Sequence, residues 1–434
     1  MIIVDTALER RHDEGNPVRV ALVGAGFMGR GIALQIIASV KGMRLVAIAN
    51  RTPSEAERAY REAGVAAVKS VDNVSQLEDA IARDQYAVTD NASLVCRAEN
   101  VEALIEATGH VEFSAGVILE AIKNKKHVIL MNAELDATIG PILKVYADRA
   151  GVIFTNADGD QPGVIMNLYR FVKAIGCRPV LAGNMKGLQD VRRTPETQKA
   201  YAAKYHQKPR MVTSFADGTK ISMEMAVVAN ATGFRAGRRG MYGPRCSHVT
   251  EAVNLFPRDQ MLNGGLVDYV LGAEPGPGVF VIGYNDHPIQ QRYLYYYKMG
   301  EGPFYTFYTP YHLCHLETPL TVARAVLFGD PAITPIAGPV CDVITVAKRD
   351  LKAGEKLDGI GGFTCYGVLE NSGICQRENL LPMGLSEGCR LKTNIAMDQA
   401  ISYENVELPA ERLCDKLRAE QNDYFLLLQR AGNS

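Results

Sequence analysis

Three glycines near the N-terminus have the spacing of a phosphate-binding turn. Gly24, Gly26 and Gly29 form a G-x-G-x-x-G frame, with Phe27 and Met28 inside it. An apolar run typical of a buried strand precedes the frame, and a segment with helical periodicity follows it. In such a unit the glycines let a dinucleotide pyrophosphate approach the helix N-terminus. All five residues are therefore predicted to contact a dinucleotide cofactor.

The next apolar run, residues 43–50, bears on which dinucleotide is bound. An Asp or Glu at its end would accept a hydrogen bond from the ribose 2′-hydroxyl of NAD. Here the chain reads Asn50-Arg51 instead, and an arginine can pair with a 2′-phosphate. The sequence thus favours NADP over NAD, unless Arg51 is an ordinary surface arginine.

Two later turns follow predicted strands of the same sheet. Thr108 and Gly109 end one strand, and Asn132, Ala133 and Glu134 end another. Ligands of doubly wound sheets lie beyond the carboxyl ends of the strands. These residues are predicted to lie near the nicotinamide, the alternative for each being a simple turn role.

Candidates for proton transfer and metal binding lie in the middle of the chain. Lys186 is predicted as an acid or electrostatic partner, and Asp160 as a base or metal ligand. Asp158 is a second candidate ligand for Mg²⁺ or Mn²⁺. Glu224, on a predicted helix, is a further catalytic candidate, and Asn184 is a candidate for substrate binding. The alternative for each polar loop residue is solvation.

Arginines in a glycine-rich segment provide a candidate anion site. Arg238 and Arg239 lie in FRAGRRGMYGPR, where guanidinium groups could hold a substrate phosphate. The equally weighted alternative is a solvated basic loop. A polar stretch before it, residues 192–210, has no strong periodicity and predicts a long loop.

The segment PYHLCHLETP contains a dense group of possible ligands. His312 and His315 are three residues apart, and Glu317 follows. On one helical turn the two histidines would share a face and could bind a divalent metal. Substrate contact or burial with hydrogen bonds is favoured over metal binding because prolines bracket the segment. His312 is predicted to contact substrate.

The elements that position these residues define an α/β chain of three domains. Strands and helices alternate through residues 1–157, which predicts a doubly wound parallel Rossmann sheet. Residues 158–335 read as an α+β catalytic domain. Residues 336–434 read as a small β-rich domain that ends in an amphipathic helix.

Composition excludes several other functions. The formal net charge of 434 residues is -1, which argues against a nucleic-acid or membrane-surface partner. No apolar stretch approaches the length of a membrane span. The nine cysteines contain no C-x-x-C pair, a pattern typical of reduced thiols in a cytoplasmic protein.

Eight motifs together resemble a known family: GAGFMGRGIALQI, NRTPSEAERAY, EATG, MNAELDATIGPIL, NADGDQPG, GNMKG, PYHLCHLETP and, near the C-terminus, AKRDLKAGEKLDGIGG, which is similar to a SAF-type domain. The chain is similar to the homoserine-dehydrogenase-like oxidoreductases, and within them to long members that end in a SAF-type domain. These members include 1-deoxy-D-xylulose-5-phosphate reductoisomerase-like enzymes of isoprenoid precursor synthesis. The turn Asn132-Ala133-Glu134 lacks the lysine of homoserine dehydrogenases, which argues against homoserine itself.

The resemblance implies NADPH, a divalent cation and a homodimer formed through the central domain. It implies a small substrate, phosphorylated in the reductoisomerase branch. Two alternatives remain open at this point. One is a simpler NAD(P)-dependent dehydrogenase of a sugar acid or a homoserine-like substrate, and the other is a non-catalytic, cofactor-bound sensor.

Overall fold

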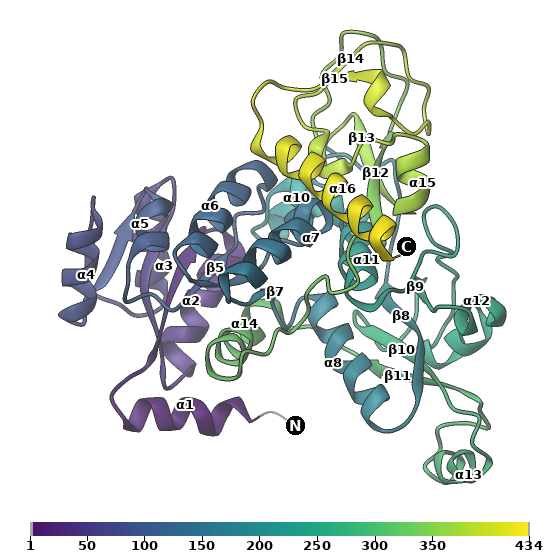
Figure 1. Ribbon diagram of the computed structural model, residues 1–434, viewed down its shortest axis with the longest axis horizontal. Coiled ribbons are helices and arrows are strands. Elements are labelled where there is room, and N and C mark those ends of the chain that lie inside the picture. Colours follow the sequence, from purple (N-terminus) through teal and green to yellow (C-terminus); the bar gives the residue numbers. More distant parts are fainter. Residues whose placement is uncertain (1–2, 433–434) are drawn as a thin grey trace. The chain divides into compact units, whose positions relative to one another are not determined.

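A computed structural model describes residues 3–432, which form two compact units (Figure 1). The first unit comprises residues 3–160 and 313–334, and the second comprises residues 161–312 and 335–432. The chain therefore leaves the first unit after residue 160, returns to it for residues 313–334, and then enters the second unit again. The C-terminal part of the chain groups with the central part as one compact unit.

The first unit is built on a seven-stranded parallel sheet, as the sequence predicts. Its strand order is β3-β4-β2-β1-β5-β6-β7, and the order reverses between β1 and β5. Ligands of such sheets bind at this switch point, beyond the carboxyl ends of the strands. The elements are α1 (Val4–Asp13), β1 (Val18–Val23), α2 (Phe27–Ser39), β2 (Met43–Ala49), α3 (Pro53–Glu62), β3 (Val68–Ser70), α4 (Val74–Ala82), β4 (Tyr86–Thr89), α5 (Ala92–Arg97), β5 (Ala103–Glu106), α6 (Val111–Lys123), β6 (His127–Leu130), α7 (Ala133–Ala150), β7 (Phe154–Asn156), α14 (Cys314–Ala323) and the π-helix η2 (Arg324–Phe328).

The returning segment completes the core of the first unit. Helix α14 packs against α2, and Val322, Ala323 and Ala325 are buried in the same apolar cluster as β1 and β2. A Cβ atom on Gly31 would lie 2.7 Å from the His315 ring. The close contact between the two helices therefore depends on a glycine at that position.

The second unit contains a mixed four-stranded sheet in the order β11-β10-β8-β9. Strands β8 and β9 are parallel, and the other neighbours are antiparallel. Helices α8 and α11 both contact the sheet. The elements up to β11 are α8 (Gln161–Ala174), β8 (Arg178–Lys186), α9 (Lys199–Lys204), α10 (Pro209–Ala216), α11 (Thr219–Thr232), η1 (Val249–Asn254), α12 (Arg258–Leu262), β9 (Leu266–Leu271), β10 (Val279–Tyr284), α13 (Pro288–Tyr296) and β11 (Phe304–Thr309).

The C-terminal elements are joined to the rest of the second unit by a buried ion pair. Lys348 lies 2.8 Å from Asp217, and both side chains are almost fully buried. Lys348 also donates to the carbonyls of Arg193 and Gly362. The elements are β12 (Cys341–Ala347), β13 (Cys365–Asn371), α15 (Ser372–Arg377), η3 (Met383–Leu385), β14 (Arg390–Leu391), η4 (Tyr403–Asn405), β15 (Val406–Glu407) and α16 (Leu413–Gly432).

One local prediction is wrong. Residues 192–210 were expected to form a long loop, but they contain α9 and the start of α10. The centroids of the Tyr201 ring, on α9, and of the Tyr205 ring, at its C-cap, lie 4.7 Å apart, a contact that the i, i+4 spacing of a helix creates. Among the described helices, none combines the length and apolar character that crossing a bilayer requires.

Candidate functional site

The glycine frame forms the turn between β1 and α2 at the switch point. Gly24 has φ +104, and a Cβ there would lie 2.9 Å from the Ala107 carbonyl oxygen. A Cβ on Gly29 would lie 2.0 Å from the Gly24 carbonyl oxygen. A Cβ on Gly26 would meet no atom within 4 Å. Gly24 and Gly29 are thus required by packing, whereas Gly26 borders open space of the kind that a pyrophosphate needs.

Helix α2 presents its N-terminus at this open space. Its N-cap residue is Gly26, and no side chain caps its first turn. Backbone amides left free at a helix N-terminus bind phosphate oxygens. Phe27 is exposed and Met28 is half-buried. The glycine turn and the N-terminus of α2 therefore fit a dinucleotide, as the predicted cofactor contacts require.

Asn50 and Arg51 follow β2, beside the same turn. The Oδ1 atom of Asn50 accepts a hydrogen bond from the Ala25 backbone amide at 3.0 Å, and its Nδ2 atom donates to the Thr52 carbonyl. Asn50 therefore braces the glycine turn from the second strand. Arg51 is exposed, and it is the charged side chain at the position where an acid would bind the ribose of NAD.

A buried carboxylate that the sequence analysis missed supports the nicotinamide-side turns. Glu106 ends β5, and one of its oxygens accepts hydrogen bonds from the Thr108 amide and hydroxyl. The other accepts from the Asn132 side chain at 2.8 Å. Burial raises the pKa of the Glu106 carboxyl, although these donors oppose the shift. An acid within an otherwise apolar strand is the signal that could have identified it.

Asn132 connects this carboxylate to the start of α7. Its Oδ1 atom accepts from the Leu135 amide, so it caps the helix. Ala133 and Glu134 lie in the first turn of α7 and are buried, whereas Thr108 and Gly109 are half-buried. The two predicted turns thus meet around Glu106 at the carboxyl edge of the sheet.

Three residues predicted for the catalytic region meet in the second unit. Asn184 and Lys186 lie on β8, two residues apart, and Glu224 lies on α11. Asn184 Nδ2 donates to Glu224 Oε2 at 3.1 Å, and Lys186 Nζ lies 4.0 Å from the same oxygen. The side chain of Glu224 is 1% exposed and that of Lys186 is 15% exposed. A Cβ on Gly187 would meet nothing within 4 Å, so Lys186 ends the strand beside open space.

The structure does not support Asp158 and Asp160 as metal ligands. Asp158 is buried in an ion pair with Arg324, with the closest atoms 3.0 Å apart. Asp160 belongs to the first unit, where its Oδ1 atom lies 4.0 Å from Cys314 Sγ. Among residues 3–432, no three or more His, Cys, Asp or Glu side chains are grouped to hold a metal ion. Asp160 belongs to the first unit, whereas Lys186 and Glu224 belong to the second.

The two arginines predicted as phosphate anchors make contacts within the protein. Arg239 lies 2.7 Å from Glu370 and 2.6 Å from Glu378. Arg238 donates to the carbonyls of Met241 and Tyr242. A phosphate would have to compete with these contacts, so the described geometry gives both arginines a structural role.

The histidine segment forms no shared ligand set. His312 lies in the second unit, where its Nε2 atom is 3.1 Å from Gln161 Nε2. His315 packs against Gly31 in the first unit, and burial lowers its pKa. Glu317 accepts from the Leu313 amide at the start of α14. Substrate contact by His312 stays a prediction.

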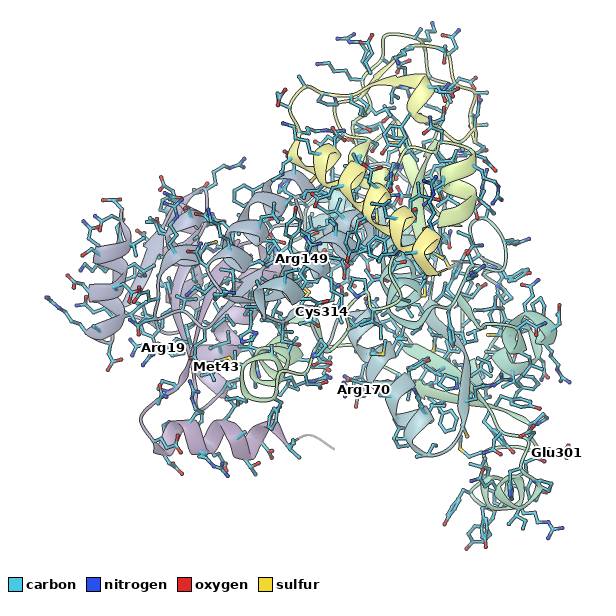
Figure 2. The ribbon with its side chains drawn as sticks, viewed as in Figure 1. Arg19, Met43, Arg149, Arg170, Glu301 and Cys314 are labelled. Atoms are coloured by element: carbon cyan, nitrogen blue, oxygen red, sulfur yellow. The ribbon has the colours of Figure 1, made fainter. Side chains whose placement is uncertain are left out.

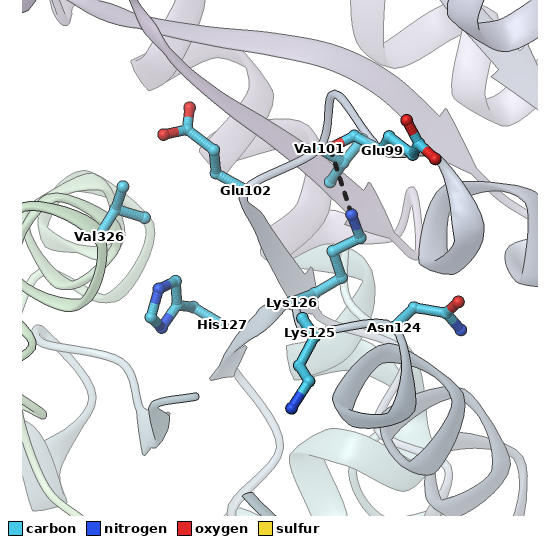
Figure 3. Close-up of a pocket in the computed structure, with 8 residues that line it drawn as sticks. All are labelled: Glu99, Val101, Glu102, Asn124, Lys125, Lys126, His127 and Val326. Carbon is cyan, nitrogen blue, oxygen red and sulfur yellow. Dashed lines mark hydrogen bonds between the residues drawn. The ribbon is translucent and has the colours of Figure 1, made fainter. Parts of the chain in front are cut away.

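A cavity of about 440 Å³ opens at the opposite edge of the first sheet, at the amino ends of β5 and β6. Figure 3 shows Lys126 directed at the Glu99 carbonyl, 3.5 Å away, with His127 beside it. Burial lowers the pKa of both side chains. This edge is remote from the switch point of the sheet, so the cavity is not the dinucleotide site.

Comparisons with known families agree with the division into two units. Residues 24–152 match the family model described as "Homoserine dehydrogenase, NAD binding domain", and residues 159–318 match "Oxidoreductase DRL, catalytic domain". Neither match extends past residue 318, so the SAF-type resemblance has no support from them. A search of curated proteins finds none that matches the sequence.

Similar solved structures include dehydrogenases at low identity. Myo-inositol dehydrogenase from Lactobacillus casei, in complex with NAD(H) and myo-inositol, is 12% identical over 74% of this chain and 89% of its own, with a TM-score of 0.42. Homoserine dehydrogenase from Thiobacillus denitrificans is 14% identical over 78% of this chain and 83% of its own, with a TM-score of 0.41. These values are too low to assign a substrate, so the functional class rests on the two domain matches.

Both matched domains are those of oxidoreductases, and the non-catalytic alternative therefore has no support. The glycine turn at the switch point fits the dinucleotide that the first match requires. This chain is an NAD(P)-dependent oxidoreductase, with an NAD-binding domain similar to that of homoserine dehydrogenase and a catalytic domain similar to that of the DRL oxidoreductases.

Proposed function

We propose that the protein is an NADP-dependent dehydrogenase that acts on a CH–OH group of a small polar substrate, of the sugar-acid or homoserine-like type. The observation that carries this proposal is the meeting of Lys186, Glu224 and Asn184 at the end of β8. This region lies within the match to an oxidoreductase catalytic domain. A lysine, a carboxylate and an amide suit recognition of hydroxyl groups and transfer of one proton.

The preference for NADP rests on the residues after β2. Asn50 is occupied by its two backbone contacts, so it is not free to replace the ribose-binding acid. Arg51 is exposed beside the turn, and a guanidinium pairs well with a phosphate. No carboxylate stands at Asn50 or Arg51 to repel the 2′-phosphate.

The proposed chemistry divides between the cofactor and the chain. A nicotinamide cofactor bound at the glycine turn would supply or accept the hydride of this reaction. In the oxidative direction the amino group of Lys186 takes the hydroxyl proton and later releases it to solvent. In the reductive direction the ammonium group returns that proton to the forming alkoxide. Glu224 positions the lysine, and Asn184 Oδ1, which has no partner within the described residues, would accept from a second substrate hydroxyl.

Reductoisomerisation of deoxyxylulose phosphate is the second candidate, and the motif resemblance favours it. It is the weaker one because it requires a metal clamp and a phosphate site. Asp158 is paired with Arg324, and the predicted phosphate arginines are engaged within the protein. The proposed dehydrogenase reaction needs neither feature.

One assay series separates these candidates. Purified protein is incubated with NADP or NAD and a panel of sugar acids and hydroxy amino acids, and reduced nicotinamide is followed by absorbance. The same preparation is tested with NADPH and deoxyxylulose phosphate, with Mg²⁺ or Mn²⁺ and then with a chelator. We expect NADP-linked oxidation of a panel member that the chelator leaves unchanged. Chelator-sensitive NADPH oxidation with deoxyxylulose phosphate would instead establish the second candidate.

A further inference from the structure

The carboxylate of Glu106 is buried at the switch point of the first sheet. Glu106 ends β5 and is fully buried, and its register partner on β1 is Val23, the residue before the glycine turn. A Cβ on Gly24 would contact the carbonyl oxygen of Ala107, the residue that follows Glu106. Glu106 therefore lies beside the turn that fits the pyrophosphate of a dinucleotide.

The hydrogen bonds around Glu106 are all directed toward its carboxylate. Asn132 Oδ1 accepts from the Leu135 amide, which fixes the orientation of the Asn132 side chain. Asn132 Nδ2 therefore donates to Glu106 Oε2 at 2.8 Å and to Ser114 Oγ at 3.3 Å. That leaves the Ser114 proton for Thr108 Oγ1, 2.9 Å away, and the Thr108 proton for Glu106 Oε1. A carboxyl group that only accepts hydrogen bonds is ionised.

Within residues 3–432, no cationic side chain pairs with this charge. The described partners of Glu106 are a backbone amide, hydroxyl groups and a side-chain amide, all of them neutral. Arg19 on β1 and Arg149 on α7, both labelled in Figure 2, lie at the far ends of these elements from Glu106 and Asn132. Burial raises the pKa of the Glu106 carboxyl. Its ionised form therefore costs free energy, which a positive group on a ligand would return.

The place of β5 in the sheet indicates which part of a dinucleotide would face Glu106. The strand order puts β2, β4 and β3 on one side of β1, and β5, β6 and β7 on the other. In this fold the dinucleotide spans the switch point with one nucleotide over each half, and the residues after β2 face the adenosine ribose. The nicotinamide nucleotide would then lie over the half that begins with β5.

We propose that Glu106 supplies the counter-charge for the oxidised nicotinamide ring and thereby sets which redox form of the cofactor binds more tightly. The oxidised ring is positively charged, whereas the reduced ring is neutral. A nearby opposite charge in a site of low dielectric favours the charged form. Glu106 therefore favours NADP⁺ over NADPH, and NAD⁺ over NADH. The proposal rests on dinucleotide binding at the glycine turn, and it does not depend on the substrate of the proposed dehydrogenase.

The test measures the dissociation constants of both redox forms by calorimetry, with the full chain and without substrate. Glu106→Gln removes the charge and keeps the shape of the side chain, and Glu57→Gln, at an exposed acid on α3, is the matched control. We expect Glu106→Gln to lower the affinity for NADP⁺ relative to NADPH about 10-fold, within the range of measured charge pairs. Glu57→Gln should leave this ratio unchanged. NAD⁺ and NADH are titrated in parallel, so the result does not depend on which dinucleotide is preferred.

A double variant separates the charge from the hydrogen-bond network. Glu106→Gln turns an amide group toward Asn132 Nδ2, and Asn132→Asp in the same chain restores an acceptor there and returns the negative charge. This double variant should recover the wild-type ratio. If it keeps the ratio of the single variant instead, the charge is not the cause.

Two further results would overturn the proposal. One is a folded Glu106→Gln variant with an unchanged ratio, and the other is an equal weakening of both redox forms, which a purely structural role predicts. Circular dichroism establishes that each variant is folded. If Glu106→Gln does not fold, wild type decides alone, because oxidised forms that bind no more tightly than the reduced forms would contradict the proposed counter-charge. If folded wild type binds no dinucleotide, the proposal fails together with the dinucleotide site.

Discussion

The two candidate sites of this chain are built in different ways. At the switch point of the first unit, backbone groups form the candidate site: Gly26 borders open space, and no side chain caps the first turn of α2. At the end of β8 in the second unit, side chains make the site, with Lys186 and Asn184 both directed at one buried Glu224 oxygen. A backbone site tolerates little change in shape, whereas a side-chain site depends on ionisable groups.

The largest effect should come from the side-chain site. Lys186→Met removes the proposed proton carrier while keeping the length of the side chain. We expect kcat to fall about 1,000-fold, within the usual range of general acid–base catalysis, with unchanged affinity for NADP. Lys199→Met, at an exposed lysine of the same unit, is the control. A variant that keeps wild-type kcat would exclude Lys186 from the chemistry.

The backbone site should respond to two glycine substitutions in different ways. Gly29→Ala places a Cβ against the Gly24 carbonyl and should cost about 1–3 kcal/mol of stability, as overpacking does, along with cofactor affinity. Gly26→Ala enters open space, so it should weaken NADP binding, up to about 100-fold for a loss of about 3 kcal/mol, with stability unchanged. Calorimetric binding and thermal unfolding measure both. If Gly26→Ala and Gly29→Ala lost equal stability, Gly26 would be required by packing in the same way as Gly29.

A smaller change should come from the one charged side chain proposed to act at the backbone site. Arg51→Glu replaces attraction to a 2′-phosphate with repulsion. We expect the preference for NADP over NAD to fall about 10- to 100-fold, the size of a charge-assisted hydrogen bond. Arg61→Glu, exposed on α3, should leave the preference unchanged. If the two variants behave alike, Arg51 is an ordinary surface arginine.

The first unit also contains an ionisable group that should matter for stability, although its candidate site is formed by the backbone. Asp136 on α7 accepts a hydrogen bond from Asn156, and burial raises its pKa from 3.8 to about 7. Because the folded state holds this proton more tightly, the stability contribution is full below pH 4 and is lost as the pH rises through 7. At 1.36 kcal/mol per pKa unit, the loss is at most roughly 4 kcal/mol.

Asp136→Asn should remove that part of the pH dependence. Asparagine has nearly the same shape as aspartate. The shape matters because the side chain packs closely against Gly140, where an added Cβ would lie 1.7 Å from Asp136 Oδ1. Urea unfolding at pH 5 and pH 8 measures the slope for both proteins. A variant whose stability falls as steeply as that of wild type between these values would contradict the assignment.

Local sequence patterns were sufficient to predict most of the fold and the glycine turn of the first unit. The glycine frame, the strands around it and the helix with Glu224 all depend on neighbouring residues, and the structure confirms these elements. Asn184 and Lys186 lie on one strand at a spacing of two, so a shared face was also predictable.

The contacts that the sequence could not predict join distant parts of the chain. Asp158 meets Arg324, 166 residues later, and a loop acid thereby becomes half of an ion pair. Arg239 meets Glu370 and Glu378, which lie 131 and 139 residues away. No sequence motif drew attention to the tyrosines of α13, which the described unit leaves exposed.

The returning segment also sets an order of events during synthesis. Residues 313–334 supply α14 and part of the first core, so the ribosome must deliver most of the chain before the N-terminal unit can close. Domains usually mature in the order in which they emerge. Here the first unit emerges first but cannot complete its core until α14 has been synthesised. By then residues 161–312 of the second unit have already left the ribosome. Until then the face of α2 that receives His315 is open to the nascent chain and to any chaperone bound to it.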